Sequence, residues 1–259
     1  MTTSVDTNAL EAKVQHMYQL VAEEPHGSYH FETGRELAEQ LGYDTAALDG
    51  APAGAIESFA GVGYFFDLAA LRPGERVFDL GSGSGMDAFL AGDLVGPAGL
   101  VVGIDFTQEQ LDKARRLARE SNVDDRVQFR HGRIDRLPAP DGMVDCVISN
   151  GVINLCPDKA AVFVEAARVL RPGGRLAIAD IVTERPLAEA IVCNVDLWAS
   201  CIGGAAQEDS YRSAIESAGL RVEEVRVNPY SFISPSARSA TATYGVKSIS
   251  LLARKQRMV

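Results

Sequence analysis

The feature that most constrains this fold is an alternation of strand-like and helix-like segments between residues 75 and 181. Five short apolar runs predict strands, at 75–80, 100–105, 127–130, 144–150 and 175–181. Such continuous apolar runs are typical of strands buried on both faces, because helices cover a parallel sheet from either side. The stretch therefore predicts an α/β fold built on a doubly wound, mostly parallel sheet.

The residues before this alternation predict an N-terminal helical extension. Apolar residues recur at helical spacing between 7 and 23, and a second short helix is expected at about 33–41. The stretch 49–63 is rich in Gly, Ala and Pro, and we interpret it as a connection to the main domain. We expect residues 1–74 to form a helical lid or cap segment.

The residues after the fifth strand predict an insert and the completion of the sheet. A helical insert is expected at about 187–203. Three further elements follow it, a helix at 208–218 and strands near 222–228 and 246–254. Residues 75–259 are thus expected to form one ligand-binding domain, to which the lid is added.

Charge and cysteine usage exclude several classes of protein. The chain has 25 basic and 35 acidic residues, a formal charge of -10, which disfavours nucleic acid and anionic membranes as partners. No 18-residue uncharged apolar run and no secretion signal are found, so we expect a cytoplasmic protein with reduced thiols. None of the four cysteines sits in a CxxC pair, and no metal site is expected.

A glycine-rich turn between the first strand and its helix predicts a ligand site. The segment Asp79-Leu-Gly81-Ser-Gly83-Ser-Gly85 allows a sharp turn and close approach of a ligand to the backbone. Asp105 ends the second strand, where a carboxylate can accept both hydroxyls of a ribose. Together they predict an adenosine-type ligand at the carboxyl ends of the strands of a Rossmann-like sheet. The spacing GxGxG differs from the dinucleotide pattern GxGxxG, and no GxxxxGK[ST] loop for a nucleoside triphosphate occurs.

The successive segments VFDLGSGSG, GIDFTQEQL, GRIDRLP, VDCVISNGVINL and VLRPGGRLAIADI resemble class I S-adenosylmethionine-dependent methyltransferases over about residues 75–181. The resemblance implies methyl transfer, with S-adenosyl-L-methionine as cofactor and S-adenosyl-L-homocysteine as product. It also implies ten cofactor-binding residues in the order of the chain: Asp79, Gly81, Ser82 and Gly83 around the methionine part, Asp105 at the ribose, Phe106 on adenine, Gln110 in the helix that follows, Ile134 and Asp135 at the adenine edge, and Asn150 beside the sulfonium. Arg133 stands where many members carry an acidic residue.

Further segments, SNGVINLCPDK and LWASCIGGA among them, look like the arsenite methyltransferase subgroup. That subgroup holds trivalent arsenic through cysteine thiolates, because arsenic is soft and prefers sulfur. This chain has Val62 and Gly151 at two of the three usual thiol positions, and Cys201 matches the third. We therefore expect a small, organic acceptor, with methylation of arsenite or a similar metalloid as the alternative. A non-catalytic cofactor-binding sensor or partner subunit is the alternative of another class.

Candidate acceptor-side residues lie in the N-terminal segment and in the insert. His26, Tyr29 and His30 are candidates for a catalytic base or lid groups, because His is the commonest general base. The candidates for substrate contacts are Tyr64, Trp198 and Cys201. For each of these residues a surface or packing role is the alternative. A small-molecule substrate is the expected partner, and the sequence leaves a homodimer open.

Overall fold

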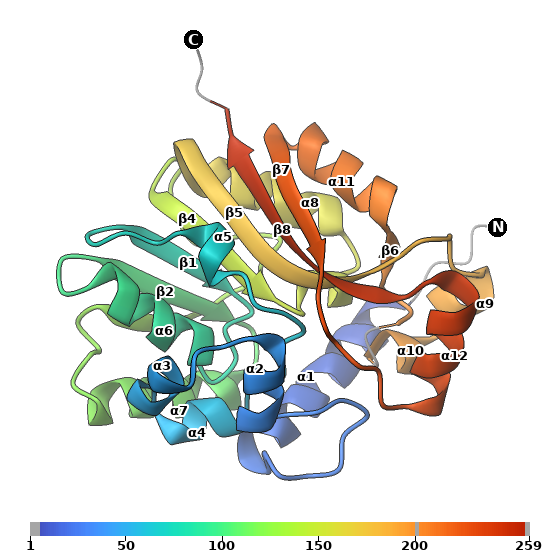
Figure 1. Cartoon of the computed structure of the whole chain (residues 1–259), viewed down its shortest axis with the longest axis horizontal. Coiled ribbons are helices and arrows are strands. Elements are labelled where there is room, and N and C mark those ends of the chain that lie inside the picture. Colours follow the sequence, from blue (N-terminus) through green and yellow to red (C-terminus); the bar gives the residue numbers. More distant parts are fainter. Residues whose placement is uncertain (1–5, 200–201, 257–259) are drawn as a thin grey trace.

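The computed structural model describes residues 6–199 and 202–256. Five strands follow one another as a parallel set, as the alternation predicts: β1 (Arg76–Leu80), β2 (Leu100–Asp105), β3 (Val127–His131), β4 (Val144–Asn150) and β5 (Leu170–Thr183). β7 (Leu220–Val227) and β8 (Lys247–Lys255) complete the sheet, whose order is β3-β2-β1-β4-β5-β8-β7. β8 runs antiparallel to β5, and the two-residue β6 (Ala206–Gln207) pairs with β5. The α/β, Rossmann-like fold is confirmed (Figure 1).

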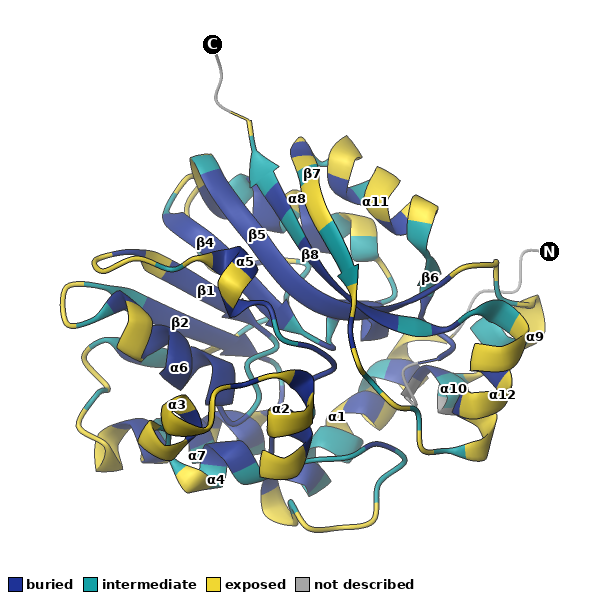
Figure 2. Ribbon diagram, in the orientation of Figure 1, coloured by how far each residue is buried: buried dark blue, intermediate teal, exposed yellow. Residues whose placement is uncertain are grey.

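Helices cover both faces of the sheet, which explains the continuous apolar runs of its strands. Successive residues of a strand point to opposite faces. Val77 therefore packs with α6 (Met86–Val95), and Phe78 packs on the other side with α8 (Lys159–Val169) and α11 (Glu208–Ser217). The strands between these two layers are buried along most of their length (Figure 2).

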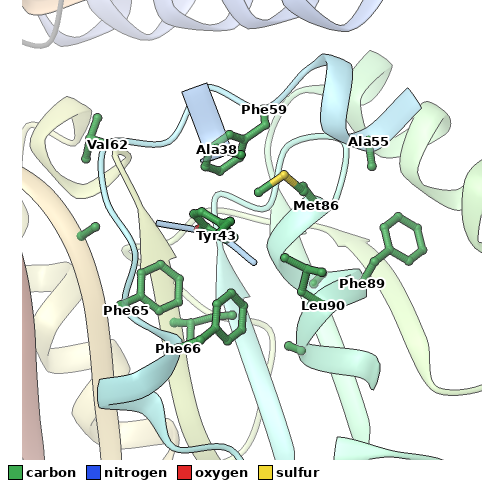
Figure 3. Packing of buried hydrophobic residues seen from close by; sticks show 14 of the residues in the cluster. Ala38, Tyr43, Ala55, Phe59, Val62, Phe65, Phe66, Met86, Phe89 and Leu90 are labelled. Carbon is green, nitrogen blue, oxygen red and sulfur yellow. The ribbon is translucent and has the colours of Figure 1, made fainter. Parts of the chain in front are cut away.

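The N-terminal segment contains more helix than the sequence predicts. α1 (Thr7–Glu23) and α2 (Arg35–Leu41) occur where expected. Residues 49–63, which the sequence predicted to be a connection, instead contain α4 (Ala53–Glu57) and overlap the end of α3 (Thr45–Gly50). α5 (Phe66–Ala69) follows them. These helices are only four to six residues long, too short for apolar periodicity to reveal them. Their buried residues share one core with the sheet, with α6 and with α7 (Gln108–Glu120). Figure 3 shows Phe66 of α5 on the same side of this core as Leu90 of α6.

The C-terminal half differs from prediction in three details. The insert forms two short helices, α9 (Glu189–Val192) and α10 (Val195–Ala199), rather than one long helix. α12 (Pro235–Tyr244) and β6 were not predicted. β5 begins five residues earlier than expected, because Leu170 already pairs with Val144 of β4 before a bulge.

The sheet topology places a crevice at the carboxyl ends of β1 and β4. The chain runs outward from β1 to β2 and β3, and then returns to the other side of β1 as β4. In open α/β sheets, ligands bind at this point of reversal. α1 lies across this end of the sheet together with α10 (Figure 1).

Candidate active site

One cavity opens at the carboxyl ends of the strands, and the empty space there, its open mouth included, is about 1100 Å³. All ten residues that the sequence predicted to bind a cofactor line it: Asp79, Gly81, Ser82, Gly83, Asp105, Phe106, Gln110, Ile134, Asp135 and Asn150. They come from the ends of β1, β2 and β4, from the loops that follow the strands, and from α7. The topology thus gathers residues that lie up to 71 positions apart in the sequence.

The glycine-rich turn adopts the conformations that its composition predicts. Gly81, Gly83 and Gly85 have positive φ angles of 71°, 51° and 96°, which L side chains rarely adopt. A Cβ at Gly81 would clash with the Val152 side chain, whereas a Cβ at Gly83 would approach only the Gln110 amide, at 3.6 Å. Gly83 therefore faces open space, as a ligand cradle requires, whereas Gly81 packs tightly against its neighbour.

Asp105 stabilises this turn from the end of β2. Its Oδ2 accepts a hydrogen bond from the Gly83 amide at 2.9 Å, and its Oδ1 accepts one from the Thr107 amide at 2.8 Å. A carboxylate oxygen has two lone pairs, so both oxygens can still accept a ribose hydroxyl. Burial raises the pKa of Asp105, although these backbone hydrogen bonds oppose that effect.

Three buried carboxylates give the cavity a negative character. Asp79, Asp87 and Asp105 all line it, and burial raises the pKa of each. The neighbouring charges of Asp87 and Asp105 raise the pKa of Asp79 further. Asp79 Oδ2 has no hydrogen-bond partner among the described residues. A buried oxygen of this kind can accept a hydrogen bond from a cationic ligand.

α1 covers the cavity and contributes residues that sequence reasoning missed. Glu11, Val14 and Tyr18 line the cavity from this helix. Glu11 binds the Arg133 guanidinium through two contacts of 2.8 Å, while Arg133 also binds both oxygens of Asp135 at 2.9 Å. These hydrogen bonds hold the pKa of Asp135 below its usual range.

Gln110 makes a second connection between α1 and the glycine turn. Its Nε2 donates to the Tyr18 carbonyl at 2.7 Å, and its Oε1 accepts from Ser84 Oγ at 2.5 Å. The Gln110 amide is thus engaged within the protein although it lines the cavity. The periodicity of apolar residues within 7–23 predicted the apolar face of α1. No pattern within this segment could indicate that the helix covers a site that includes Gln110, 92 residues after Tyr18.

The three candidate catalytic residues lie outside the cavity lining. His26 is exposed, and Tyr29 Oη donates to the Glu24 carbonyl at 2.7 Å. His30 packs edge-on against the Phe31 ring, with centroids 4.6 Å apart. All three belong to the loop that leaves α1, and their catalytic role stays a prediction that this arrangement does not support.

The substrate candidates are likewise absent from the described cavity wall. Tyr64 packs edge-on against Tyr43 at 5.0 Å. Trp198 is buried, donates through Nε1 to the Val192 carbonyl, and shares a small core with Val14 and Leu155. Because those two residues line the cavity, Trp198 supports its wall from behind. Cys201 lies outside the described residues.

Comparison with known proteins identifies the class. A family model described as a methyltransferase domain matches residues 71–219, more than half of the chain. The chain therefore belongs to the methyltransferase domain family. No helix among residues 6–199 and 202–256 is long and apolar enough to cross a membrane.

The individual relatives include enzymes with inorganic and organic acceptors. An arsenite methyltransferase of Halobacterium salinarum is 41% identical over 198 residues, covering 75% of this chain and 49% of the relative. A 27-O-demethylrifamycin SV methyltransferase of Amycolatopsis mediterranei is 34% identical over 161 residues, covering 60% and 57%. The crystal structure of an arsenic(III) S-adenosylmethionine methyltransferase from Chlamydomonas reinhardtii matches with 32% identity and a TM-score of 0.68, covering 82% of this chain and 73% of that one. The chain spans about half the length of the first curated relative.

The residues present fit S-adenosylmethionine, the cofactor of this family. Asp105 would hold the ribose, and the glycine turn would face the methionine part. Asp79, with its unpartnered buried oxygen, would bind the amino group. The cofactor carries a sulfonium and an ammonium, so a cavity with three buried carboxylates suits its charge.

Proposed function

We propose that this chain transfers a methyl group from S-adenosylmethionine to trivalent arsenic. The observation that carries the proposal is the similarity to arsenite methyltransferases, which extends over 75% of the chain in one relative and 82% in a solved structure. All ten of the expected cofactor residues line the cavity, which supports the methyl-transfer part of the proposal.

The cofactor supplies, when bound, a methyl group activated by its sulfonium charge. The residues of the chain orient the two reactants and exclude water, which is the main requirement of a direct displacement. Asp79 and Asp87 both line the cavity, and their charge would favour the cationic methionine part of the cofactor. α1 and the residues around Phe59 cover the same space from the N-terminal side.

The structure brings together two positions at which the arsenite subgroup carries thiols. A Cβ built on Gly151 would lie 3.2 Å from Val62 Cγ1, although the residues are 89 positions apart. Here these positions hold no sulfur, so Cys201 is the thiol that matches the subgroup pattern. Arsenic bound to one protein thiolate would take its remaining sulfur ligands from small thiols such as glutathione.

Cys156 is a poor replacement for the missing thiols, although it lines the cavity. Burial raises its pKa to about 11, with a smaller contribution from the Asp135 charge. The thiol is therefore neutral near pH 7, whereas the thiolate is the form that binds metals and metalloids. Its neighbours Asp135 and Arg133 also place it at the end of the cavity assigned to adenine.

A small organic acceptor is the second candidate, because Val62 and Gly151, which adjoin the cavity-lining residues Gly61 and Val152, carry no thiol. The similarity to the rifamycin methyltransferase supports this alternative. Such an acceptor would occupy the space next to these two residues without forming a bond to sulfur.

Release of S-adenosylhomocysteine, measured with and without arsenite in the presence of glutathione, distinguishes the two candidates. We expect arsenite-dependent release, with methylated arsenic found by mass spectrometry. Cys201→Ser should abolish the arsenite-dependent rate, and Cys193→Ser should leave it unchanged as a matched thiol control. A rate of S-adenosylhomocysteine release that does not depend on arsenite would reject the arsenic assignment and favour an organic acceptor. Equal rates in the Cys201 variant and the wild type would do the same.

A further inference from the structure

Asp87 connects three separate parts of the chain inside the protein. It lies in the first turn of α6 and is buried. Its Oδ1 accepts a hydrogen bond from Tyr43 Oη at 2.7 Å, and its Oδ2 accepts one from Asn150 Nδ2 at 3.1 Å. Tyr43 belongs to the N-terminal segment between α2 and α3, while Asn150 ends β4. Asn150 Nδ2 also donates to Tyr43 Oη at 3.0 Å, which closes the network.

Asn150 extends this network to the loop formed by residues 60–63. Its Oδ1 accepts hydrogen bonds from the amides of Val62 at 2.8 Å and Gly63 at 3.3 Å, and its Nδ2 donates to the Gly63 carbonyl at 3.0 Å. Both polar atoms of the side chain are therefore occupied within the protein. The resemblance implied a position beside the sulfonium for Asn150, whereas in the structure its side chain fixes the 60–63 loop through hydrogen bonds.

The 60–63 loop is packed too closely for side chains at its glycines. A Cβ at Gly61 would lie 2.6 Å from Asn150 Nδ2, and a Cβ at Gly63 would collide with the Asn228 side chain. Ser248 Oγ fixes the opposite side of the loop by donating to the Val62 carbonyl at 2.6 Å. The loop is thus held between the end of β4 and strand β8.

The position of the loop connects the network with the acceptor. Ala60 and Gly61 line the cofactor cavity, and Val62, the next residue, packs against Gly151. The Tyr43 ring reaches Asp87 through a cluster in which Phe59 and Tyr64 pack edge-on against it, with centroids 5.3 and 5.0 Å away. Figure 3 shows Tyr43 between Phe59 and Phe66, with Val62 on the adjoining loop.

We propose that Tyr43, Asp87 and Asn150 are positioning residues for methyl transfer, which set the 60–63 loop, and with it the acceptor, against the reactive end of the cofactor. The inference rests on the proposed methyl transfer. Hydrogen bonds to an ionised carboxylate are stronger than neutral ones, so Asp87 fixes both donors tightly. The network acts on the geometry between two reactants, and its loss should affect turnover more than cofactor affinity.

Tyr43→Phe tests this proposal, because it removes one hydroxyl and keeps the packed ring. We expect the dissociation constant of S-adenosylmethionine to stay within threefold and kcat to fall by at least tenfold. Amide hydrogen exchange at Val62 and Gly63 should accelerate at least tenfold. Tyr211→Phe is the matched control, since Tyr211 Oη donates to a second buried carboxylate, Asp180, at 2.6 Å. It should destabilise the protein similarly without changing kcat or exchange at the loop.

Equal kcat and equal loop exchange in the Tyr43 and Tyr211 variants would overturn the proposal. A parallel loss of cofactor affinity and kcat in Tyr43→Phe would also overturn it, since that would mark a cofactor-binding role. Asn150→Asp provides a second variant of the same size, in which a new carboxylate faces Asp87 and should release the loop. If the wild type turns over no acceptor, the proposed function fails, whereas loop exchange still decides whether the network holds the loop.

Discussion

At the scale of single residues, the site is defined by acidic side chains without a free counter-charge. Arg133 is the basic residue among those that line the described cavity, and it is engaged by Glu11 and Asp135. Asp79 and Asp87 therefore face the cavity as uncompensated carboxylates, a state that is stable only when they take up a proton or bind a cation. A ligand with positive charge is what this arrangement selects.

The sequence revealed two of these acids and missed the third. Asp79 lies beside the glycine turn and Asp105 at the end of a strand, and both positions belong to a recognisable motif, so the sequence identifies them. Asp87 looks like an ordinary acid in the first turn of a helix, where such residues are common. Its role depends on Tyr43 and Asn150, which lie 44 and 63 residues away. Local patterns cannot reveal such partners.

The acids predict how cofactor binding depends on pH. Burial raises the pKa of Asp87 to about 6, and burial together with the neighbouring carboxylates raises the pKa of Asp79 well above its usual range. A cation binds the ionised forms, so affinity for S-adenosylmethionine should rise as the pH increases through about 6 and fall below it. Calorimetric titrations between pH 5 and 8 check this. S-adenosylhomocysteine, which lacks the sulfonium charge, should respond less. An affinity for S-adenosylmethionine that stays constant between pH 5 and 8 would contradict the charge argument.

The glycine turn predicts a second effect at this scale. Gly81→Ala combines a positive φ with a clash against Val152, so it should abolish measurable cofactor binding. Gly96→Ala is the matched control, because Gly96 has a φ of 64° and open space around its Cβ position. Because its ψ of -171° places Gly96 in a region that essentially only glycine adopts, the control should cost about 1–3 kcal/mol of stability from backbone strain alone. It should leave the dissociation constant unchanged, and similar constants for the two variants would argue against a ligand cradle.

At the scale of elements, α1 acts as a cover fastened by side chains. Glu11 joins it to Arg133, Tyr18 accepts from Gln110, and Gln15 Nε2 donates to the Phe106 carbonyl at 3.4 Å. The sequence predicted this helix and its apolar face correctly. It assigned function instead to the loop after it, where three polar side chains cluster, because clustering along the chain is visible and contact across the fold is not.

Arg133→Gln should loosen this cover. The side chain of Arg133 is about half exposed, so the pair with Glu11 is worth about 1 kcal/mol or less. Dissociation of S-adenosylhomocysteine, followed by stopped flow, should accelerate by roughly two- to fivefold. Arg116→Gln, which breaks an exposed pair with Glu120 on α7, serves as the control and should have no effect. An unchanged rate in Arg133→Gln would show that the ion pair does not restrain α1.

At the scale of the whole molecule, the parallel half of the sheet could be predicted from the sequence. The N-terminal segment and the elements after β5 could be predicted only in part. Strands buried on both faces carry a continuous apolar signal, and the five occur where the sequence predicted them, apart from the earlier start of β5. The helices α3, α4 and α12 gave no clear signal, since their buried residues are few and Gly, Ala and Ser dominate them. Their positions are set by packing against the sheet rather than by local preference.

The central claim is that the cavity at the carboxyl ends of the strands binds S-adenosylmethionine through residues gathered by this topology. Calorimetric titration of the wild type and Asp105→Asn tests it most directly, with Asp124→Asn as an exposed control. We predict one-site binding by the wild type and the control. The Asp105 variant should lose about 1.5–3 kcal/mol of binding free energy, roughly ten- to a hundredfold in affinity, because hydrogen bonds to a charged acceptor are lost. No binding by the wild type, or equal affinity in all three proteins, would contradict the claim.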